Sequence, residues 1–504
     1  MIRKPEMNTK LEVLKNLAVG ERVAEEESEQ LENYFVETDQ WHKMVGGNID
    51  VVYGPKGSGK SALYTLLNKK DGELFDRGVL LVSAENVRGA TVFRTIVADP
   101  PPSELSFIYL WKIYSLCLIA KALREYEVKN ENSQALIGAL EKVGLLPTAS
   151  SLAVLFRSVT NYFKGWLKRD TKAVEYAVTI DPTTGAPTIS RKTEFADISE
   201  EQSLGEIPVE ELYEIANKAL TKAGLSVWVL FDRLDVAFAD SLDLERNALR
   251  ALFRAYNDLK AYTNLSLKIF VRDDIWQRIT LGGFTEASHI TKSVHITWSE
   301  ESLLNLIMLR LLNNQSLIDY AEVNPNEIRS DYQKQHDLFY RLFPRQVDTG
   351  KNPDTFNWIL SRTTDSSGNS VPREVIHLLE MAKEIQIRKL ERGSDEPPES
   401  QLFDRPSFKE ALPIVSKVRF EQTLLAEYPD MREHLIKLAN EKAEQTPESL
   451  QKLWNKGEEE TSEIARRLAE IGFFDIRGTK EEPTFWIPFL YRSALNLVQG
   501  KVGD

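Results

Sequence analysis

Cysteine is nearly absent from this sequence, which contains Cys117 as its single cysteine among 504 residues. One cysteine excludes an internal disulfide framework and any zinc site built on several cysteines, and it is typical of a reducing compartment. The six histidines are scattered without the paired spacing of metal ligands. We therefore expect a cytoplasmic protein without a metal site made of protein ligands alone.

Long apolar runs are also missing. The most apolar stretch, residues 105–123, includes Lys112 and Lys121 as well as several other polar side chains. We interpret it as a buried or interface helix, because charged side chains are costly inside a bilayer. The first residues, MIRKPEMNTKLEVLKNL, lack the continuous apolar core of a signal peptide. The sequence therefore predicts a protein that is neither exported nor bound to a membrane.

Positive charge is in short supply, because 63 Lys and Arg residues face 76 Asp and Glu residues and leave a net charge of -13. Constitutive nucleic-acid binding depends on a basic surface, so nucleic acid is a possible partner that we do not favour. Residues 164–169 form a basic aromatic cluster, which an amphipathic helix explains as well as nucleic-acid contact does. Arg466 and Arg467 lie among five glutamates, which favours protein contact over DNA.

Four β-branched and apolar runs predict strands, at residues 49–53, 78–83, 227–231 and 267–271. Continuous apolar strands separated by helices indicate a parallel sheet covered on both faces, so the fold class is α/β. Residues 84–226 are far longer than a simple crossover requires and contain an insertion. Besides the helix at 105–123, we expect a hairpin of residues 174–180 and 188–191 around a turn at 181–185.

The remaining sequence predicts a modular chain. We expect an N-terminal helical segment (1–45) whose acidic run 24–29 is a solvated face, an α/β core (46–297), a helical lid (298–392), a polar linker (393–404) and a winged-helix-like C-terminal domain (405–504). Within the lid we expect helices at 301–312, 333–342 and 371–389. Within the C-terminal domain we expect a helix at 462–471 and a strand pair at 473–476 and 484–487.

The most specific motif follows the first predicted strand. Gly54, Pro55, Lys56, Gly57, Ser58, Gly59, Lys60 and Ser61 match G-x-x-x-x-G-K-[ST] in full, with a helical stretch after them. The glycines let backbone N–H groups converge on an anion, and the helix N-terminus adds a favourable dipole. Lys60 would reach the β- and γ-phosphates and the Ser61 hydroxyl would ligate Mg²⁺. We predict an ATP and Mg²⁺ site here; the alternative is a glycine turn without a ligand.

Two aspartates follow the third strand. Asp232 comes directly after the apolar run and is our candidate for the Mg²⁺ side of the site, although an acid there could also cap a helix. Asp235, three residues on, is a candidate for polarising the attacking water, with a helix cap again as the alternative.

Two arginines are candidate sensors. Arg272 follows the fourth strand and would lie beside the γ-phosphate, because ligands lie outside the carboxyl ends of such strands. A local ion pair with Asp274 is the alternative. Arg373 begins the helix 371–389 and could reach over the nucleotide from the lid, or lie in solvent.

Together these features resemble AAA+-related P-loop ATPases of the STAND, KAP and origin-recognition type, and in layout the P-loop ATPases of bacterial conflict and phage-defence systems. The resemblance covers most of the chain outside residues 84–226, and only its P-loop is highly specific. It implies phosphate binding at residues 54–61, Mg²⁺ at Asp232, a sensor role for Arg272 and a lid role for Arg373. Related ATPases often place a glutamate directly after the metal-side acid. Here that position is Arg233, which puts efficient hydrolysis in doubt.

We therefore expect a switch ATPase that binds and slowly hydrolyses ATP and then forms a homo-oligomer or engages an effector protein, in bacterial antiviral defence. The alternatives are a nucleic-acid-loading ATPase of origin-recognition type and a non-hydrolysing scaffold that nucleotide stabilises. Stimulation of turnover by DNA or RNA would favour the first alternative, and absence of turnover the second. We expect the insertion to carry partner recognition, because the nucleotide site does not require it.

Overall fold

The computed structural model describes residues 9–20, 27, 29–85, 104–148, 151–167, 188–189, 207–234, 242–280, 283–368 and 370–501. The chain divides into two compact units. The sheet unit contains Asp39–Gly54 and Lys60–His295, and the helical unit contains Met1–Thr38, Pro55–Gly59 and Ile296–Asp504. The middle of the glycine-rich motif thus belongs to the helical unit, while its two ends belong to the sheet unit.

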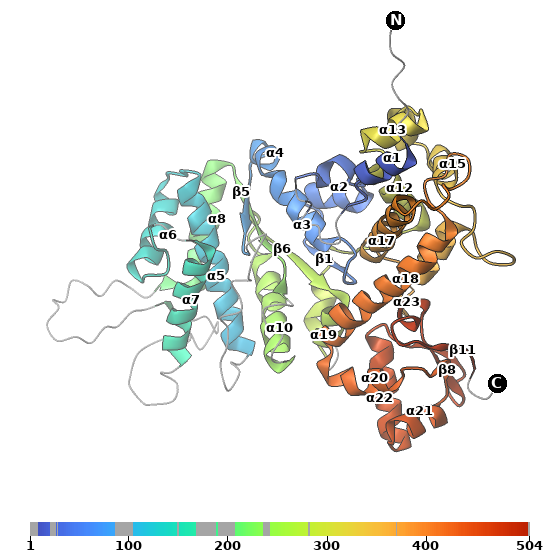
Figure 1. Cartoon of the computed structure of the whole chain (residues 1–504). Coiled ribbons are helices and arrows are strands. Elements are labelled where there is room, and N and C mark those ends of the chain that lie inside the picture. Colours follow the sequence, from blue (N-terminus) through green and yellow to red (C-terminus); the bar gives the residue numbers. More distant parts are fainter. Residues whose placement is uncertain are drawn as a thin grey trace, which may run out of the picture. The chain divides into compact units, whose positions relative to one another are not determined.

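The sheet unit is built on five parallel strands in the order β2-β5-β6-β1-β7 (Figure 1). They are β1 (Val51–Gly54), β2 (Val79–Ser83), β5 (Ser226–Phe231), β6 (Leu265–Arg272) and β7 (Ser293–His295). The first four confirm the predicted strands and the α/β class. The sequence analysis missed β7, because it has three residues, none of them fully buried, and no apolar run marks it.

Helices complete the sheet unit. They are α2 (Asp39–Val45), α3 (Lys60–Lys69), α4 (Asp71–Asp76), α5 (Glu104–Glu125), α6 (Glu131–Lys142), α7 (Leu152–Leu167), α8 (Val209–Ala223), α10 (Leu242–Leu259), α11 (Asp273–Thr280) and the 3₁₀-helix η4 (Thr285–His289). The apolar helix α5 belongs to the core of this unit: the Trp111 indole donates to the backbone oxygen of Ala248 at 2.7 Å and the Tyr114 hydroxyl to that of Ala84 at 2.6 Å. Among the described helices, none combines the length and apolar character needed to cross a membrane.

The insertion contains more than the predicted helix, because α6 and α7 follow α5. The first strand and the turn of the predicted hairpin, residues 174–185, lie outside the described residues. The short strand β3 (Thr188–Ile189) pairs antiparallel with β4 (Ile207–Pro208).

The helical unit holds a large apolar core, whose residues range along the sequence from Val13 to Leu495, and a smaller cluster of Val36, Leu306 and Ile376. Its helices are α1 (Lys10–Asn16), the 3₁₀-helix η1 (Leu31–Tyr34), α12 (Glu300–Leu311), α13 (Gln315–Ala321), α14 (Pro325–Arg329), α15 (Tyr332–Leu342), α16 (Thr355–Thr363), α17 (Pro372–Glu391), α18 (Arg405–Arg419), the π-helix η5 (Phe420–Leu424), α19 (Leu425–Glu427), the 3₁₀-helix η6 (Pro429–Met431), α20 (Arg432–Lys437), α21 (Pro447–Trp454), α22 (Glu458–Glu470) and α23 (Phe489–Arg492) (Figure 1). The predicted lid helices and the helix before the wing are confirmed with shifts of a few residues at their ends.

A small sheet near the C-terminus has the strand order β11-β8-β10-β9. Its strands are β8 (Lys442–Gln445), β9 (Asp475–Gly478), β10 (Pro483–Trp486) and β11 (Val498–Lys501). The antiparallel pairing of β9 with β10 aligns Ile476 with Phe485 and confirms the predicted wing, although β9 begins two residues later than expected. With the helices before it, this sheet forms the winged-helix-like unit.

The N-terminal prediction needs two corrections. The segment 1–45 is not a continuous amphipathic helix, since its described part contains α1, η1 and α2 separated by irregular backbone. The acidic run is also not wholly a solvated face: Glu27 is buried and accepts two hydrogen bonds from the Arg310 guanidinium at 2.8 and 2.9 Å. A partner so far along the sequence leaves no trace in the local pattern.

Candidate phosphate-binding site

The glycine-rich loop connects the end of β1 to the start of α3. Gly57 and Gly59 have φ angles of 86° and 101°, in the left-handed region that glycine adopts without a steric penalty. The Ser58 amide donates to the Pro55 carbonyl at 3.2 Å and closes a turn between them. A loop with such residues can aim several N–H groups at one anion, directly before the positive end of a helix dipole.

Lys60 lies folded back along this loop. The side chain is buried and its Nζ donates to the backbone oxygen of Gly54 at 2.7 Å. Because Gly54 and Lys60 are the two ends of the loop, the ammonium closes the loop. The predicted contact of Lys60 with phosphate stays a prediction.

The strand order brings three predicted residues to the same edge of the sheet. β6 lies between β1 and β5, and Gly54 of β1 is aligned with Arg272 of β6. Asp232 directly follows β5 and is buried. The loop, Arg272 and Asp232 thus follow the carboxyl ends of three adjacent strands, where ligands of such sheets bind. A parallel sheet in this order, with this loop and lysine, is the fold of a P-loop NTPase.

A second buried carboxylate, that of Glu85, was missed by the sequence analysis. It lies two residues beyond β2 and is fully buried, and the Tyr64 hydroxyl of α3 donates to its backbone oxygen at 3.0 Å. Burial raises the pKa of Tyr64, and the negative charges of Asp232 and Glu85 raise it further. Both acidic residues therefore lie near the Tyr64 side chain. An acid after an apolar strand, the signal used for Asp232, would also have found Glu85.

Arg272 forms the local ion pair that was the alternative to a sensor role. Its Nε and one terminal nitrogen each donate to Asp274 at 2.9 Å, a bidentate arrangement. Arg278 contacts the same carboxylate at 3.6 Å and pairs with Glu245 at 2.8 Å. Arg272 is thus at the expected strand end, but it would have to exchange a carboxylate for a phosphate to act as a sensor.

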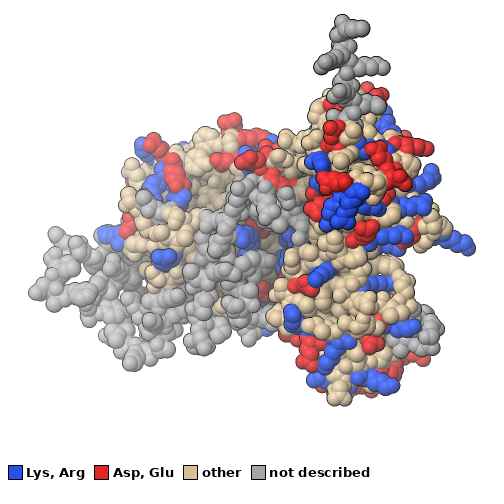
Figure 2. Space-filling model, viewed as in Figure 1, with Lys and Arg blue, Asp and Glu red and all other residues tan. Residues whose placement is uncertain are grey.

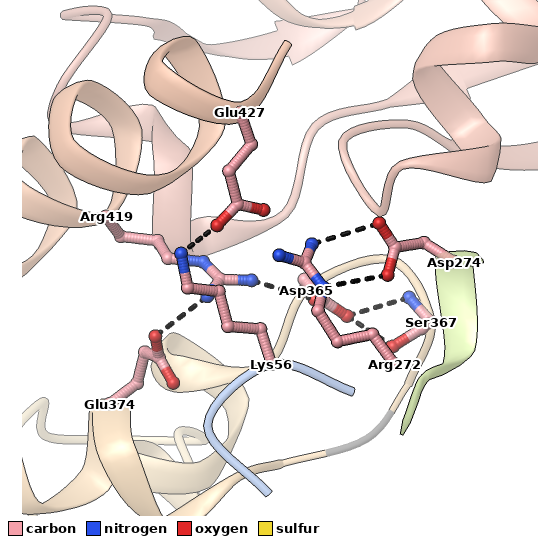
Figure 3. Close-up of polar contacts among 8 residues, drawn as sticks. All are labelled: Lys56, Arg272, Asp274, Asp365, Ser367, Glu374, Arg419 and Glu427. Carbon is pink, nitrogen blue, oxygen red and sulfur yellow. Dashed lines mark hydrogen bonds and ion pairs between the residues drawn. The ribbon is translucent and has the colours of Figure 1, made fainter. Parts of the chain in front are cut away.

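The helical unit contributes side chains to the loop residues it contains. The Trp298 indole donates to the Ser58 backbone oxygen at 2.9 Å, and the Lys56 ammonium pairs with Glu427 of α19 (Figure 3). A Cβ atom on Gly57 would lie 2.9 Å from the Cβ of Arg373, so glycine is needed there for a second reason. Arg373 therefore lies against the loop, and its role over the nucleotide stays a prediction. Neither Trp298 nor Glu427 carries a local sequence signal.

Next to Arg373 in the sequence, Glu374 belongs to a charged cluster of the helical unit. The Arg419 guanidinium, at the end of α18, donates to Glu374 at 3.0 Å and to Asp365 at 3.3 Å (Figure 3). Burial by itself would lower the pKa of Arg419, but the facing Tyr491, Glu374 and Asp365 outweigh burial and raise it. Arg419 is therefore a fixed cation that ties α18 to the residue next to Arg373.

The donor set fits Mg²⁺ only with help from a ligand. Ser61, in the first turn of α3, and the buried Asp232 supply the hard oxygen atoms that Mg²⁺ requires. Within the described part of the chain, no three His, Cys, Asp or Glu side chains group as a metal site. A Mg²⁺ ion here would complete its coordination with phosphate oxygens and water, as is usual at nucleotide sites. Asp235 lies outside the described residues, so its expected role stays a prediction.

Comparison with known proteins gives distant matches. No family model and no curated protein matches the chain. Among solved structures it is similar to the ORC1 protein of Aeropyrum pernix in complex with DNA, at 12% identity and a TM-score of 0.36 over 97% of both chains. It is also similar to the Walker-type ATPase PABY2304 of Pyrococcus abyssi, at 10% identity and a TM-score of 0.38, over 91% of this chain and 95% of that chain. Matches this distant transfer no activity, so the functional argument depends on the site itself.

Proposed function

We propose that this protein is a nucleotide-dependent switch of the P-loop ATPase class, which binds ATP with Mg²⁺ at residues 54–61 and hydrolyses it slowly. Pro55–Gly59 belong to the helical unit, and the side chains of Trp298, Glu427 and Arg373 in that unit contact them. These contacts are the observation that carries the proposal. A ligand shifts a conformational equilibrium only through interactions that differ between the two states. A phosphate in this loop would change the surroundings of those three side chains directly.

Binding in this proposal depends on charge-assisted hydrogen bonds. The loop N–H groups and the Lys60 ammonium hold the β- and γ-phosphates, with Lys60 exchanging or sharing its bond to the Gly54 oxygen. Ser61 and Asp232 hold Mg²⁺, which when bound neutralises phosphate charge during transfer. Burial of Asp232 at the strand end strengthens its attraction for a cation, because less water screens it.

Slow hydrolysis follows from the residue after Asp232. Arg233 occupies the position where related ATPases often carry a glutamate, and a guanidinium cannot accept a proton from the attacking water. Its φ of 56° is in the left-handed region, a strained conformation for arginine that is often found at functional sites. Asp235 remains our proposal for orienting the water.

Two arginines would report the γ-phosphate. Arg272 would leave Asp274 for the phosphate when ATP is bound and return to it with ADP. Arg373, beside Gly57, would act from the lid. Each carries its charge at the working pH, so position alone decides whether it contributes.

We propose a second copy of the chain or an effector protein as the partner of the ATP-bound form. The net charge of -13 argues against nucleic acid. On the face drawn in Figure 2, acidic and basic side chains are interspersed over the described part, without a broad basic area. A role in antiviral defence rests on the sequence resemblance alone. A host strain carrying the Lys60→Ala form should lose any protection against phage that the parent gives.

One experiment tests the switch. The parent, Lys60→Ala and the control Lys69→Ala, which removes an exposed lysine from the same helix, are each sized by mass photometry without nucleotide, with ADP and with ATP plus Mg²⁺. We expect the parent and Lys69→Ala to bind ATP. Their particle mass should change with ATP plus Mg²⁺ and not with ADP. Lys60→Ala should neither bind ATP nor change in mass. Normal ATP affinity in Lys60→Ala would refute the phosphate site. Turnover stimulated by added DNA duplex would instead favour a nucleic-acid-loading ATPase.

A further inference from the structure

The helical unit presents two carboxylates to a loop that would bind phosphate. Glu427 pairs with Lys56, and their side chains are 18% and 30% exposed. The carboxylate of Glu374 lies beside Gly57. Its Oε2 is 3.4 Å from the position of a Cβ on Gly57 and, among the described residues, has no hydrogen-bond partner. Carboxylates at this place oppose an incoming anion, because like charges repel strongly where water is scarce.

Lys56 lies between two competing partners. Lys56 is the first lysine of the loop and its ammonium contacts a carboxylate, whereas the Lys60 ammonium donates to the backbone oxygen of Gly54. A triphosphate with Mg²⁺ bound in the loop would attract the same ammonium and repel Glu427. Nucleotide and Glu427 therefore compete, because both are anions that draw on one ammonium and repel each other.

The segment that carries Glu427 has a fixed end and an irregular middle. Arg419, at the end of α18, is anchored by Glu374 and Asp365 (Figure 3). The π-helix η5 follows, and α19 ends at Glu427. π-Helical turns are rare and are often found at functional sites. Movement of Glu427 can therefore be absorbed between Arg419 and α19 without disturbing the anchor.

From this geometry we propose that the Lys56–Glu427 pair is an autoinhibitory latch, which nucleotide binding must open. This inference rests on the proposed nucleotide binding. Coupling of this kind is reciprocal: if nucleotide weakens the latch, loss of the latch must strengthen nucleotide binding by the same factor. The acid of the pair therefore opposes ligand binding, which is the reverse of what a residue that merely supports the loop would do.

The test is a double-mutant cycle on ATP affinity. Glu427→Gln keeps the shape of the side chain and removes its charge, and we expect it to tighten ATP·Mg²⁺ binding about 5- to 20-fold in isothermal titration. The control Glu421→Gln, an exposed acid of the π-helix, should leave affinity unchanged. In a Lys56→Gln background, the Glu427→Gln change should tighten binding less, because only the direct repulsion between the carboxylate and the phosphates is then relieved. Weaker binding by Glu427→Gln, or equal tightening in the Lys56→Gln background, would overturn the latch.

A second measurement does not need nucleotide. Hydrogen exchange of the free protein should be faster at residues 420–428 in Glu427→Gln than in the parent, with other segments unchanged. If the parent binds no nucleotide, the proposed function fails, and the exchange measurement still tests whether the Lys56–Glu427 pair holds residues 420–428. Unchanged exchange at residues 420–428 would refute the latch.

Discussion

The two lysines of the phosphate loop differ in what surrounds them. Lys60 is buried, and its ammonium closes the loop on the backbone oxygen of Gly54. Lys56 is more exposed and is engaged by a carboxylate of the helical unit. Two lysines of one loop thus have different partners, a backbone oxygen and a carboxylate.

The two buried carboxylates near Tyr64 can be separated by their dependence on metal. We expect Asp232→Asn to lose most of the gain in ATP affinity that Mg²⁺ gives, because Asp232 follows the strand next to β6 and is our Mg²⁺-side residue. Glu85→Gln should keep that gain, since β2 lies one strand farther from the loop. ATP affinity with and without Mg²⁺ measures both. Equal losses in the two variants would contradict the assignment.

Arg272 gives a prediction about nucleotide discrimination. Arg272→Ala should bring the affinities for ATP and ADP closer together, because the exchange of Asp274 for a γ-phosphate is lost. Asp274→Asn should have the opposite effect, because it frees the same guanidinium from its competing partner. Titration of each nucleotide into both variants measures the ratio. The sensor role is wrong if neither variant alters it.

At the scale of elements, the N-terminal segment is tied to α12 by a buried ion pair. Arg310 donates to Glu27 and to the backbone oxygen of Val19, and its guanidinium lies 4.3 Å from the ring centroid of Tyr34. Val19, Glu27 and Tyr34 of the N-terminal segment therefore all contact the Arg310 side chain. The charges of Glu27 and Arg310 are both buried, so each is compensated by the other rather than by water.

Removing one member of this pair should destabilise the helical unit. We expect Arg310→Met to cost about 3–5 kcal/mol, because Glu27 is left as an uncompensated buried charge. Lys334→Met, which breaks a more exposed pair with Glu327, should cost no more than about 1 kcal/mol. Adding Glu27→Gln to Arg310→Met should recover part of the loss. Thermal unfolding midpoints compare all three, and equal shifts for the two single variants would refute the buried-pair argument.

The elements that could be predicted are those whose signal is local. β1, β2, β5 and β6 are apolar runs because both faces of the parallel sheet are covered, and each run is visible in the sequence. β7 has three half-buried residues and gives no such run. The Arg272–Asp274 pair was foreseen as an alternative because its members are two residues apart.

The contacts that could not be predicted join distant segments. Glu27 with Arg310, Lys56 with Glu427 and Trp298 with Ser58 each depend on tertiary packing. The motif predicts where phosphate would bind, but nothing near it in the sequence identifies the side chains that contact the loop. The sequence therefore indicated the candidate phosphate-binding residues and not their distant neighbours.

At the scale of the whole chain, the insertion divides into a structural part and a part outside the described residues. Helix α5 belongs to the core of the sheet unit, where Trp111 is fully buried and bonds to the backbone of α10. The expectation that the insertion is dispensable for the nucleotide site cannot hold for this helix. It can hold for residues 171–195, since Lys60, Asp232 and Arg272 all lie elsewhere in the sequence.

Two changes within residues 84–226 should therefore have opposite consequences. Deletion of residues 171–195 should leave ATP affinity and single-turnover hydrolysis unchanged but abolish the ATP-dependent change in size, if this segment recognises the partner. Trp111→Ala should instead lower the thermal midpoint and ATP affinity together, because loss of a large buried side chain costs about 3–5 kcal/mol in the core that supports β2 and β5. Thermal unfolding, titration and mass photometry of the two variants separate these effects. A deletion variant that still changes size with ATP would show that partner recognition lies outside residues 171–195.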